Sequence, residues 1–230
     1  MTPKVALIVG AGPGLSASVA RRLAERGAKV ALAARRLERI EPIAGELGGR
    51  AFACDAGEPS EVAGLFAAVD AELGSPDFVL YNASARARGP LVDIAAEDVE
   101  RALRVSAFGG FLVAQQAARR MLAAGGGAIF FTGASASVKG YAQSAPFAMG
   151  KFALRGLAQS LARELAPKNI HVAHFVIDGA IRNPGRTEPP DAPDSMLDPD
   201  AIAATCMAVL DQPRSAWSWE VEVRPWVERF

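Results

Sequence analysis

The sequence predicts an α/β fold, a doubly wound parallel sheet of about seven strands in a single domain over residues 1–230. Short apolar runs alternate with longer segments of helical spacing along the whole chain. The apolar runs are nearly continuous, as expected for parallel strands that helices cover on both faces. A chain of 230 residues, 50% of them hydrophobic, is long enough for one buried core.

Each expected element follows from its own pattern, and every strand-to-strand crossover is expected to be right-handed. The apolar runs predict strands at 5–9 (VALIV), 29–34 (KVALAA), 50–54 (RAFAC), 77–81 (DFVLY), 128–132 (AIFFT), 170–177 (IHVAHFVI) and 219–223 (WEVEV). Apolar residues at helical spacing predict helices at 15–26, 37–47, 58–73, 96–123, 147–165 and 199–210.

One segment, residues 178–198, fits neither pattern. It carries four prolines and several acids, which predict a long loop. Because it follows the sixth strand, on the edge where such sheets bind ligands, we interpret it as a lid over a substrate. The alternative is a solvated excursion at the surface.

Composition excludes several classes of partner. There are 25 basic and 25 acidic residues, so the formal net charge is zero and neither nucleic acid nor an anionic membrane is expected as a partner. Cys54 and Cys206 predict free thiols in a reducing, cytoplasmic compartment. His171 and His174 lie three residues apart on one strand and so face opposite sides, and no metal site is expected.

A glycine-rich turn joins the first strand to the first helix. Such a turn lets backbone N–H groups and the helix N-terminus approach a pyrophosphate. It therefore predicts a dinucleotide-binding Rossmann fold. The residues expected at the phosphates are Gly10, Gly12, Pro13, Gly14, Leu15 and Ser16.

Two arginines stand at the end of the second strand, where NAD sites usually offer a carboxylate to the ribose. Arg35 and Arg36 instead suit the 2′-phosphate of NADP(H), since a guanidinium binds phosphate as a planar fork. The alternative is that they, with Arg39, form the solvated start of a helix.

These motifs, in their order and spacing, resemble the short-chain dehydrogenase/reductase family over essentially the whole chain. The turn reads VGAGPGLS where the family has TGxxxGxG. The resemblance implies an NADP(H)-dependent oxidoreductase with a small-molecule substrate, assembled as a homodimer or homotetramer through the long helix 96–123 and the next helix. Further cofactor contacts implied by it are Asp55, Ala56, Asn82, Ala83, Ser84, Lys151, Gly179 and Ile181.

The chain departs from the family at its catalytic tetrad of Asn, Ser, Tyr and Lys. By spacing, Ser106 takes the asparagine position, Ala134 with Ser135 beside it takes the serine position, and Phe147 takes the tyrosine position. Lys151 remains, and the resemblance implies that it holds the nicotinamide ribose. The FAMGK motif and the tails 214–217 (RSAW) and 224–230 (RPWVERF) resemble a subgroup with phenylalanine at this position.

A phenyl ring cannot donate a proton, so another group has to do so if carbonyls are reduced. Tyr141 and the hydroxyls of Ser135, Ser137 and Ser144 are the candidates, although loop hydroxyls usually bind nearby backbone. Two hypotheses stay open: a slow or specialised reductase, and a catalytically silent NADP(H)-binding or scaffold protein.

Arg86 and Arg88, after the fourth strand, either select an anionic substrate or belong to a solvated loop.

Overall fold

The computed structural model describes residues 1–228; the last two residues of the tail motif, Arg229 and Phe230, lie outside the described residues. Its main sheet has seven parallel strands in the order β3-β2-β1-β4-β5-β6-β9. These strands are β1 (Val5–Val9), β2 (Lys29–Ala34), β3 (Arg50–Ala53), β4 (Phe78–Tyr81), β5 (Gly127–Thr132), β6 (Ile170–Ile177) and β9 (Glu220–Val223). The doubly wound α/β fold expected from the sequence is therefore confirmed.

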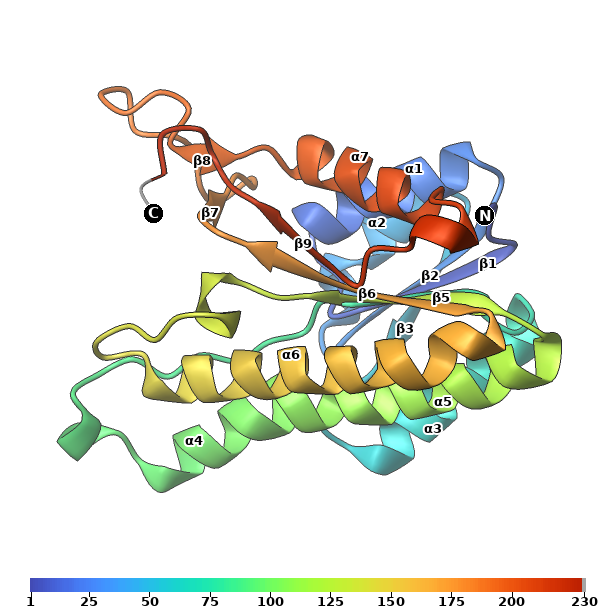
Figure 1. The fold of residues 1–230 in the computed structure, drawn as a ribbon, viewed down its shortest axis with the longest axis horizontal. Helices are drawn as coiled ribbons and strands as arrows, with labels where there is room; N and C mark the ends of the chain where they lie inside the picture. Colours follow the sequence, from blue (N-terminus) through green and yellow to red (C-terminus); the bar gives the residue numbers. More distant parts are fainter. Residues whose placement is uncertain (229–230) are drawn as a thin grey trace.

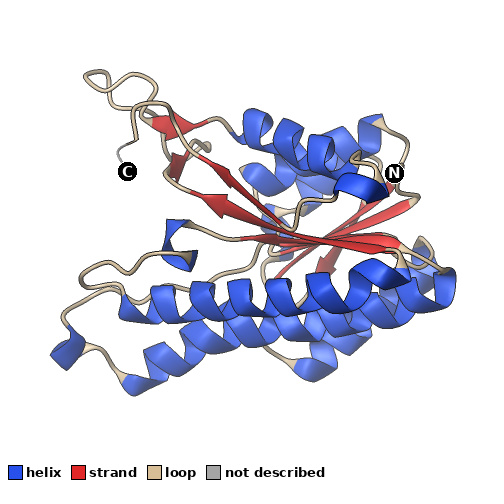
Figure 2. Cartoon of the chain, in the orientation of Figure 1, coloured by secondary structure: helices blue, strands red, loops and turns tan. Residues whose placement is uncertain are grey.

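Helices cover both faces of the sheet, as Figures 1 and 2 show. One layer holds α1 (Leu15–Glu25), α2 (Glu41–Glu46) and α7 (Pro199–Leu210). The other holds α3 (Pro59–Glu72), α4 (Ala96–Leu103), α5 (Gly109–Ala124) and α6 (Ala145–Leu165). Short 3-10 turns complete the chain: η1 (Leu37–Arg39), η2 (Leu91–Asp93), η4 (Ser135–Ser137), η5 (Ala166–Lys168) and η6 (Arg214–Ala216).

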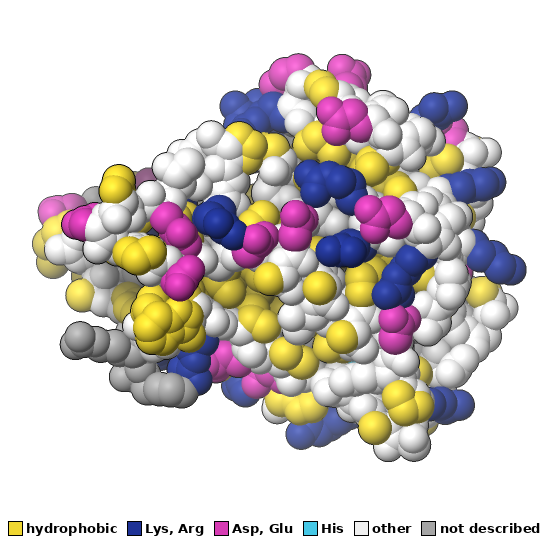
Figure 3. Space-filling view, turned by 90° about the horizontal axis from the view of Figure 1, so that it is seen from above, with side chains coloured by type: hydrophobic (Ala, Val, Ile, Leu, Met, Phe, Trp, Pro, Cys, Tyr) yellow, Lys and Arg dark blue, Asp and Glu magenta, His cyan; other side chains and the backbone are white. Residues whose placement is uncertain are grey.

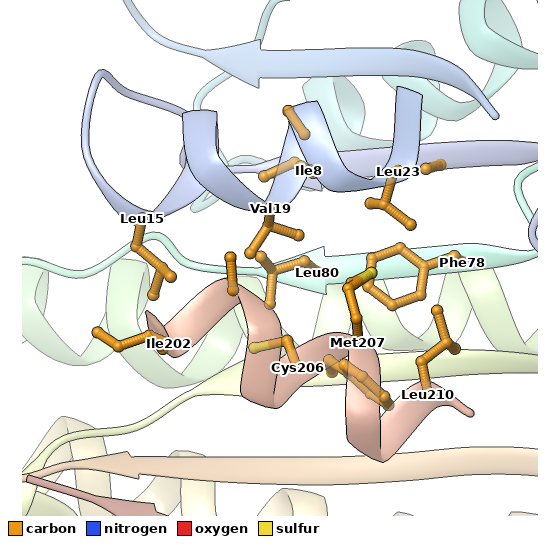
Figure 4. Close-up of a cluster of buried hydrophobic side chains, with 14 of the residues drawn as sticks. Ile8, Leu15, Val19, Leu23, Phe78, Leu80, Ile202, Cys206, Met207 and Leu210 are labelled. Atoms are coloured by element: carbon orange, nitrogen blue, oxygen red, sulfur yellow. The ribbon is translucent and has the colours of Figure 1, made fainter. Parts of the chain in front are cut away.

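Alternate residues of each central strand enter two separate cores. On β1, Ile8 packs toward α1 and α7, whereas Leu7 packs toward α3, α5 and α6. Figure 4 shows the first core, where Val19 of α1 lies beside Leu80 of β4, and Met207 of α7 lies beside Phe78 of the same strand. Because both faces of these strands are buried, their sequences are continuously apolar.

Two expected helices are interrupted in the structure. The segment 37–47 forms η1 and then α2, whose first turn contains Pro42, a residue that lacks an N–H and favours the first turn of a helix. The segment 96–123 contains a π-helical turn, η3 (Arg104–Phe108), between α4 and α5. Such turns insert one residue per turn and occur frequently at functional sites. Periodicity alone did not reveal either break.

The proline-rich segment 178–198 is a loop that a small parallel ladder closes at its base. Strands β7 (Ala180–Ile181) and β8 (Met196–Leu197) form this ladder, which sequence patterns did not predict because each strand has two residues. An ion pair between Arg182 and Asp198, 2.5 Å apart, ties the same two ends together.

The face formed by α1 and α7 carries charges of both signs in alternation (Figure 3). On this face Arg21 pairs with Asp200, and Arg26 pairs with Asp211. No helix of the described chain is long and apolar enough to cross a membrane. Cys54 and Cys206 are buried and free.

Candidate active site

The strand order reverses between β1 and β4, because β1 leads to β2 on one side and pairs with β4 on the other. In open α/β sheets, ligands bind outside the carboxyl ends of the strands at such a switch point. A cavity of about 910 Å³ opens there, and both the glycine turn after β1 and the loop after β4 line it. This volume is at the upper end of the range for small-molecule and cofactor sites.

The glycine turn is braced from two sides. Gly10 and Ala11 donate backbone hydrogen bonds to the carbonyl of Ala33 at the end of β2, at 2.9 and 3.0 Å. The side-chain amide of Asn82 donates to the carbonyl of Gly10 at 3.0 Å and to the hydroxyl of Ser16 at 2.9 Å. Helix α1 then begins without a side-chain cap and without an acid in its first turn. Its first amides are therefore available to an anion.

Gly10 has no room for a side chain. Its φ is +82°, and a Cβ would lie 2.3 Å from the backbone nitrogen of Ala83. We expect Gly10→Ala to lower the free energy of unfolding by at least about 2 kcal/mol, since the left-handed conformation alone costs about 1–2 kcal/mol. Gly12→Ala is the matched control, because no described heavy atom lies within 4 Å of its added Cβ. Urea denaturation of both variants measures the difference, and equal stabilities would contradict this account of the turn.

All six residues predicted at the phosphates line the cavity, and so do four of the other predicted cofactor contacts, Asn82, Ser84, Gly179 and Ile181, as well as Lys151. Ala83 lies behind Gly10. Asp55 is half-buried and accepts a hydrogen bond from the amide of Gly57 at 2.9 Å, and Ala56 is buried. Neither Asp55 nor Ala56 belongs to the cavity wall.

Arg35 and Arg36 are exposed at the end of β2, outside the cavity lining. Arg39, one turn further on, does line it. The arginines therefore flank one end of the cavity, at the side of the glycine turn.

Lys151 and Phe147 lie one turn apart on α6 and face the same cavity. The ammonium of Lys151 donates to the carbonyl of Thr132 at 2.7 Å and lies 5.9 Å from the centre of the Phe147 ring. Burial, and then the nearby charge of Arg86, lowers the pKa of Lys151 to about 7. This lysine is thus held next to the ring and close to a change of protonation state at neutral pH.

The other tetrad position, Ser106, lies in the π-helical turn and is fully buried. It packs against α6, because a Cβ added to Gly150 would meet its Cβ at 2.8 Å. Its hydroxyl accepts a hydrogen bond from the amide of Ala85 at 3.1 Å. Ser106 therefore fixes the loop after β4 and is not itself part of the cavity wall.

The candidate proton donors separate into two groups. Ser135, Tyr141 and Ser144 line the cavity beside Ala134. Ser137 is buried, and its hydroxyl accepts a hydrogen bond from the amide of Ala134 at 3.1 Å. The hydroxyl of Ser137 thus binds neighbouring backbone, as is common for loop hydroxyls.

The two strand histidines make separate contacts. His171 stacks on Trp217, with ring centres 4.6 Å apart. His174 lies 3.0 Å from the carboxylate of Glu220, which also pairs with Arg155. Burial lowers the pKa of His174 to about 4, so its ring is neutral at pH 7. Among residues 1–228 no group of three His, Cys, Asp or Glu side chains is placed to hold a metal ion.

Several cavity residues were not singled out from the sequence. They come from the loop before α6 and from the proline-rich segment: Gln143, Arg182, Asn183 and Arg186, with Glu228 from the tail. Only the first part of the proline-rich segment, up to Arg186, reaches the cavity. The position of this segment after β6 was the signal that pointed toward the site.

The comparisons with known proteins agree on one family. The protein-family model for short chain dehydrogenase matches residues 4–187 of this chain. The chain is 32% identical over 171 residues to a 3-oxoacyl-acyl-carrier-protein reductase of Homo sapiens, covering 74% of this chain and 72% of that protein. It is 30% identical over 220 residues to carbonyl reductase family member 4 of Xenopus tropicalis, covering 91% and 92%.

Solved structures show the same relationship. A short-chain dehydrogenase from Rhodopseudomonas palustris is 35% identical and has a TM-score of 0.81, with 96% of this chain and 98% of that chain covered. An alcohol dehydrogenase from the archaeon Thermococcus sibiricus, complexed with 5-hydroxy-NADP, is 25% identical with a TM-score of 0.86 and 98% of both chains covered. With the glycine turn, the strand order and the lysine on α6 all in place, the chain belongs to the short-chain dehydrogenase family.

Proposed function

We propose that this protein is an NADP(H)-dependent oxidoreductase acting on a small carbonyl or hydroxyl compound, with Phe147 in place of the family's tyrosine. The observation that carries this proposal is the cavity of about 910 Å³ at the carboxyl ends of the strands. It joins the glycine turn and the open N-terminus of α1 at one end to Lys151 and Phe147 at the other. In a dinucleotide the pyrophosphate joins two nucleosides, so a cavity that continues from the phosphate-binding turn to Lys151 and Phe147 has room for the reactive nicotinamide nucleoside.

The residues present fit the cofactor. The glycine turn and the uncapped amides of α1 suit the pyrophosphate, and the open space beside Gly12 leaves room for it. Arg35 and Arg36, exposed beyond β2, suit a 2′-phosphate. Two solved relatives, the Thermococcus sibiricus enzyme and a metagenomic short-chain oxidoreductase that is 28% identical, are described as complexes with NADP or a derivative of it.

The chemistry that the bound cofactor would supply is hydride transfer to a carbonyl carbon, whose oxygen would need a proton. Lys151, whose ammonium donates to the carbonyl of Thr132, would hold the nicotinamide ribose by further hydrogen bonds. Phe147, 7% exposed, excludes water from one side of the reacting centre. Tyr141, or a water held by Ser135 and Ser144, delivers the proton. The missing phenol makes this step slower than in relatives that have it.

The arginines after β2 should set the preference for NADP(H). We expect the wild-type protein to bind NADPH more tightly than NADH in a fluorescence titration. Arg35→Ala and Arg36→Ala should each reduce the ratio of the NADPH affinity to the NADH affinity by about 10- to 100-fold. The reason is that a charge-assisted hydrogen bond contributes about 1.5–3 kcal/mol.

Arg22→Ala removes an exposed arginine on α1 and is the control. It should leave the ratio of the two affinities unchanged. Equal affinity of the wild-type protein for NADPH and NADH would refute the role of these two arginines.

A second candidate function is a catalytically silent NADP(H)-binding or scaffold protein. The observation that favours it is that three tetrad positions lack the family's residue: the hydroxyl of Ser106 binds the loop after β4, and Ala134 and Phe147 carry no hydroxyl. The two functions differ in one measurement. An enzyme oxidises NADPH in the presence of a carbonyl substrate, whereas a silent binder retains the cofactor unchanged.

We further propose that the chain forms a homodimer or homotetramer in the cytoplasm. Large apolar side chains are exposed on and beside α5 and α6: Phe108, Phe111, Leu122, Met149 and Phe152, each more than 40% exposed. Phe108 and Phe111 stack with their ring centres 6.3 Å apart. Exposed apolar residues gathered on adjacent helices are typical of subunit contacts.

A further inference from the structure

Three arginines line the cavity, and one of them, Arg86, lies on the ring of Phe147 within electrostatic range of the other two. Arg86 and Arg88 come from the loop after β4, and Arg186 comes from the proline-rich segment across the cavity. Among the described residues, no carboxylate lies within ion-pairing distance of any of the three. Burial, followed by the charges of Arg88 and Arg186, lowers the pKa of Arg86, so both of these arginines lie near enough to act electrostatically on it.

Arg86 lies over the aromatic ring of Phe147. Its guanidinium carbon lies 3.9 Å from the centre of the Phe147 ring, which is within the range of a cation–π contact. Such stacking uses the face of the guanidinium and leaves the N–H donors along its edge free. A fixed planar fork with free edge donors is the geometry that recognises a carboxylate or phosphate.

The loop that carries Arg86 is anchored on both sides. The hydroxyl of Ser106 accepts a hydrogen bond from the amide of Ala85, the residue directly before Arg86. On the other side, the amide of Gly89 donates to the carbonyl of Gln143 at 3.1 Å. The position of Arg86 is therefore set by the fold and does not depend on a ligand.

The acids of the cavity do not neutralise this group. Asp178 is bound to Lys139 at 3.1 Å, and Glu228 is the other acid of the cavity wall. The cofactor phosphates have their own residues at the glycine turn, whereas Arg86 stands on the ring of Phe147, beside Lys151. The positive charge at this end consequently faces the space for the substrate.

We propose that Arg86, with Arg88 and Arg186, binds an anionic group of the substrate, so that the protein acts on a small carbonyl or hydroxyl compound bearing a carboxylate or a phosphate. This inference rests on the proposed function for the position of the reacting carbon. Phe147 then has a role that needs no hydroxyl, as the platform that orients Arg86.

The test compares two pairs of related probes, in each of which one member carries an anionic group and the other is neutral. Acetoacetate is paired with methyl acetoacetate, and dihydroxyacetone phosphate is paired with dihydroxyacetone. Binding of each is measured by calorimetry to the free protein and to the protein saturated with NADPH, whose binding is established beforehand. The charged member of at least one pair should bind at least about tenfold more tightly, and the pair that shows the difference identifies carboxylate or phosphate.

Arg86→Gln should remove about 10- to 100-fold of the affinity for the charged probe and leave the neutral probe unchanged. Arg86→Lys should restore only part of it, because an ammonium lacks the fork. Arg22→Gln removes an arginine charge from α1, in the helical layer on the other face of the sheet, and should leave the affinity for both probes unchanged. Circular dichroism and thermal unfolding establish that each variant is folded. Arg88→Gln and Arg186→Gln are second variants, which should also lower the affinity for the charged probe.

Equal affinities within both pairs, or no binding of any probe, would overturn the proposal. So would an Arg86→Gln variant that binds charged and neutral probes with equally reduced affinity. Failure of NADPH to bind is a separate result, since it counts against the proposed function while the probes are still compared on the free protein.

Discussion

Replacing Phe147 by tyrosine is expected to raise kcat for NADPH-dependent reduction of a simple diketone by about 10²–10⁴, the usual contribution of a positioned general acid. The ring already faces the cavity between Arg86 and Lys151. Both cations favour ionisation of a phenol placed there and so bring its pKa toward neutrality. The gain corresponds to about 3–5 kcal/mol of activation free energy.

The matched control is Phe152→Tyr, a change on the same helix at a side chain that is 45% exposed and lies outside the cavity lining. It should leave kcat unchanged. The cation–π platform survives in Phe147→Tyr, because tyrosine binds cations at least as well as phenylalanine.

Three outcomes separate the hypotheses for Phe147. A measurable wild-type rate that rises in the tyrosine variant supports the slow reductase. A wild-type rate of zero with an active variant supports the silent binder. No gain in a folded variant that binds NADPH would contradict the expectation, and Ala134→Ser combined with Phe147→Tyr then tests whether the missing serine hydroxyl is the cause.

Replacing Lys151 by methionine is expected to stabilise the free protein near pH 6 and to lose this advantage as the pH rises. Burial and the charge of Arg86 lower the folded-state pKa of Lys151 from 10.5 to about 7. Between these values the unfolded chain binds one more proton than the folded chain, so the wild-type free energy of unfolding rises with pH. The slope is about 1.4 kcal/mol per pH unit, and the full difference is on the order of 5 kcal/mol.

Neighbouring groups do not titrate in this window. The pKa of His174 lies at about 4, and the guanidinium of Arg86 keeps its proton. Although burial opposes it, hydrogen bonds from Arg155 lower the pKa of Glu220. The change in relative stability between pH 7 and 9 therefore belongs to Lys151.

Urea denaturation of both proteins at pH 6, 7, 8 and 9 measures this effect. Lys168→Met, the control, removes an exposed lysine just after α6. Its free energy of unfolding should differ from that of the wild type by the same amount at every pH. If Lys151→Met gave the same difference at every pH, Lys151 would be charged throughout, and the account of its burial would be wrong. Loss of its hydrogen bond to Thr132 subtracts about 1 kcal/mol at every pH.

Local patterns were sufficient for the sheet and for the phosphate end of the site. Each strand of the main sheet lies within about one residue of its expected bounds, because a strand buried on both faces must be apolar throughout. The turn at Gly10 was equally readable, since only glycine tolerates its φ of +82° beside Ala83. Short irregular elements were less readable, and the π-helical turn at Ser106 and the ladder β7–β8 have no periodic signal.

The sequence by itself determined the α/β layers, the glycine turn, and the absence of a hydroxyl at position 147, because these depend on residue type and on neighbours along the chain. Only the tertiary structure decided that Arg86 lies on the ring of Phe147, that Ser106 anchors the loop before it, and that Lys151 is buried enough to lower its pKa. These three facts join β4, α6 and the π-helical turn, which are far apart in the chain. Contacts between distant segments depend on how the layers pack, and no local spacing encodes them.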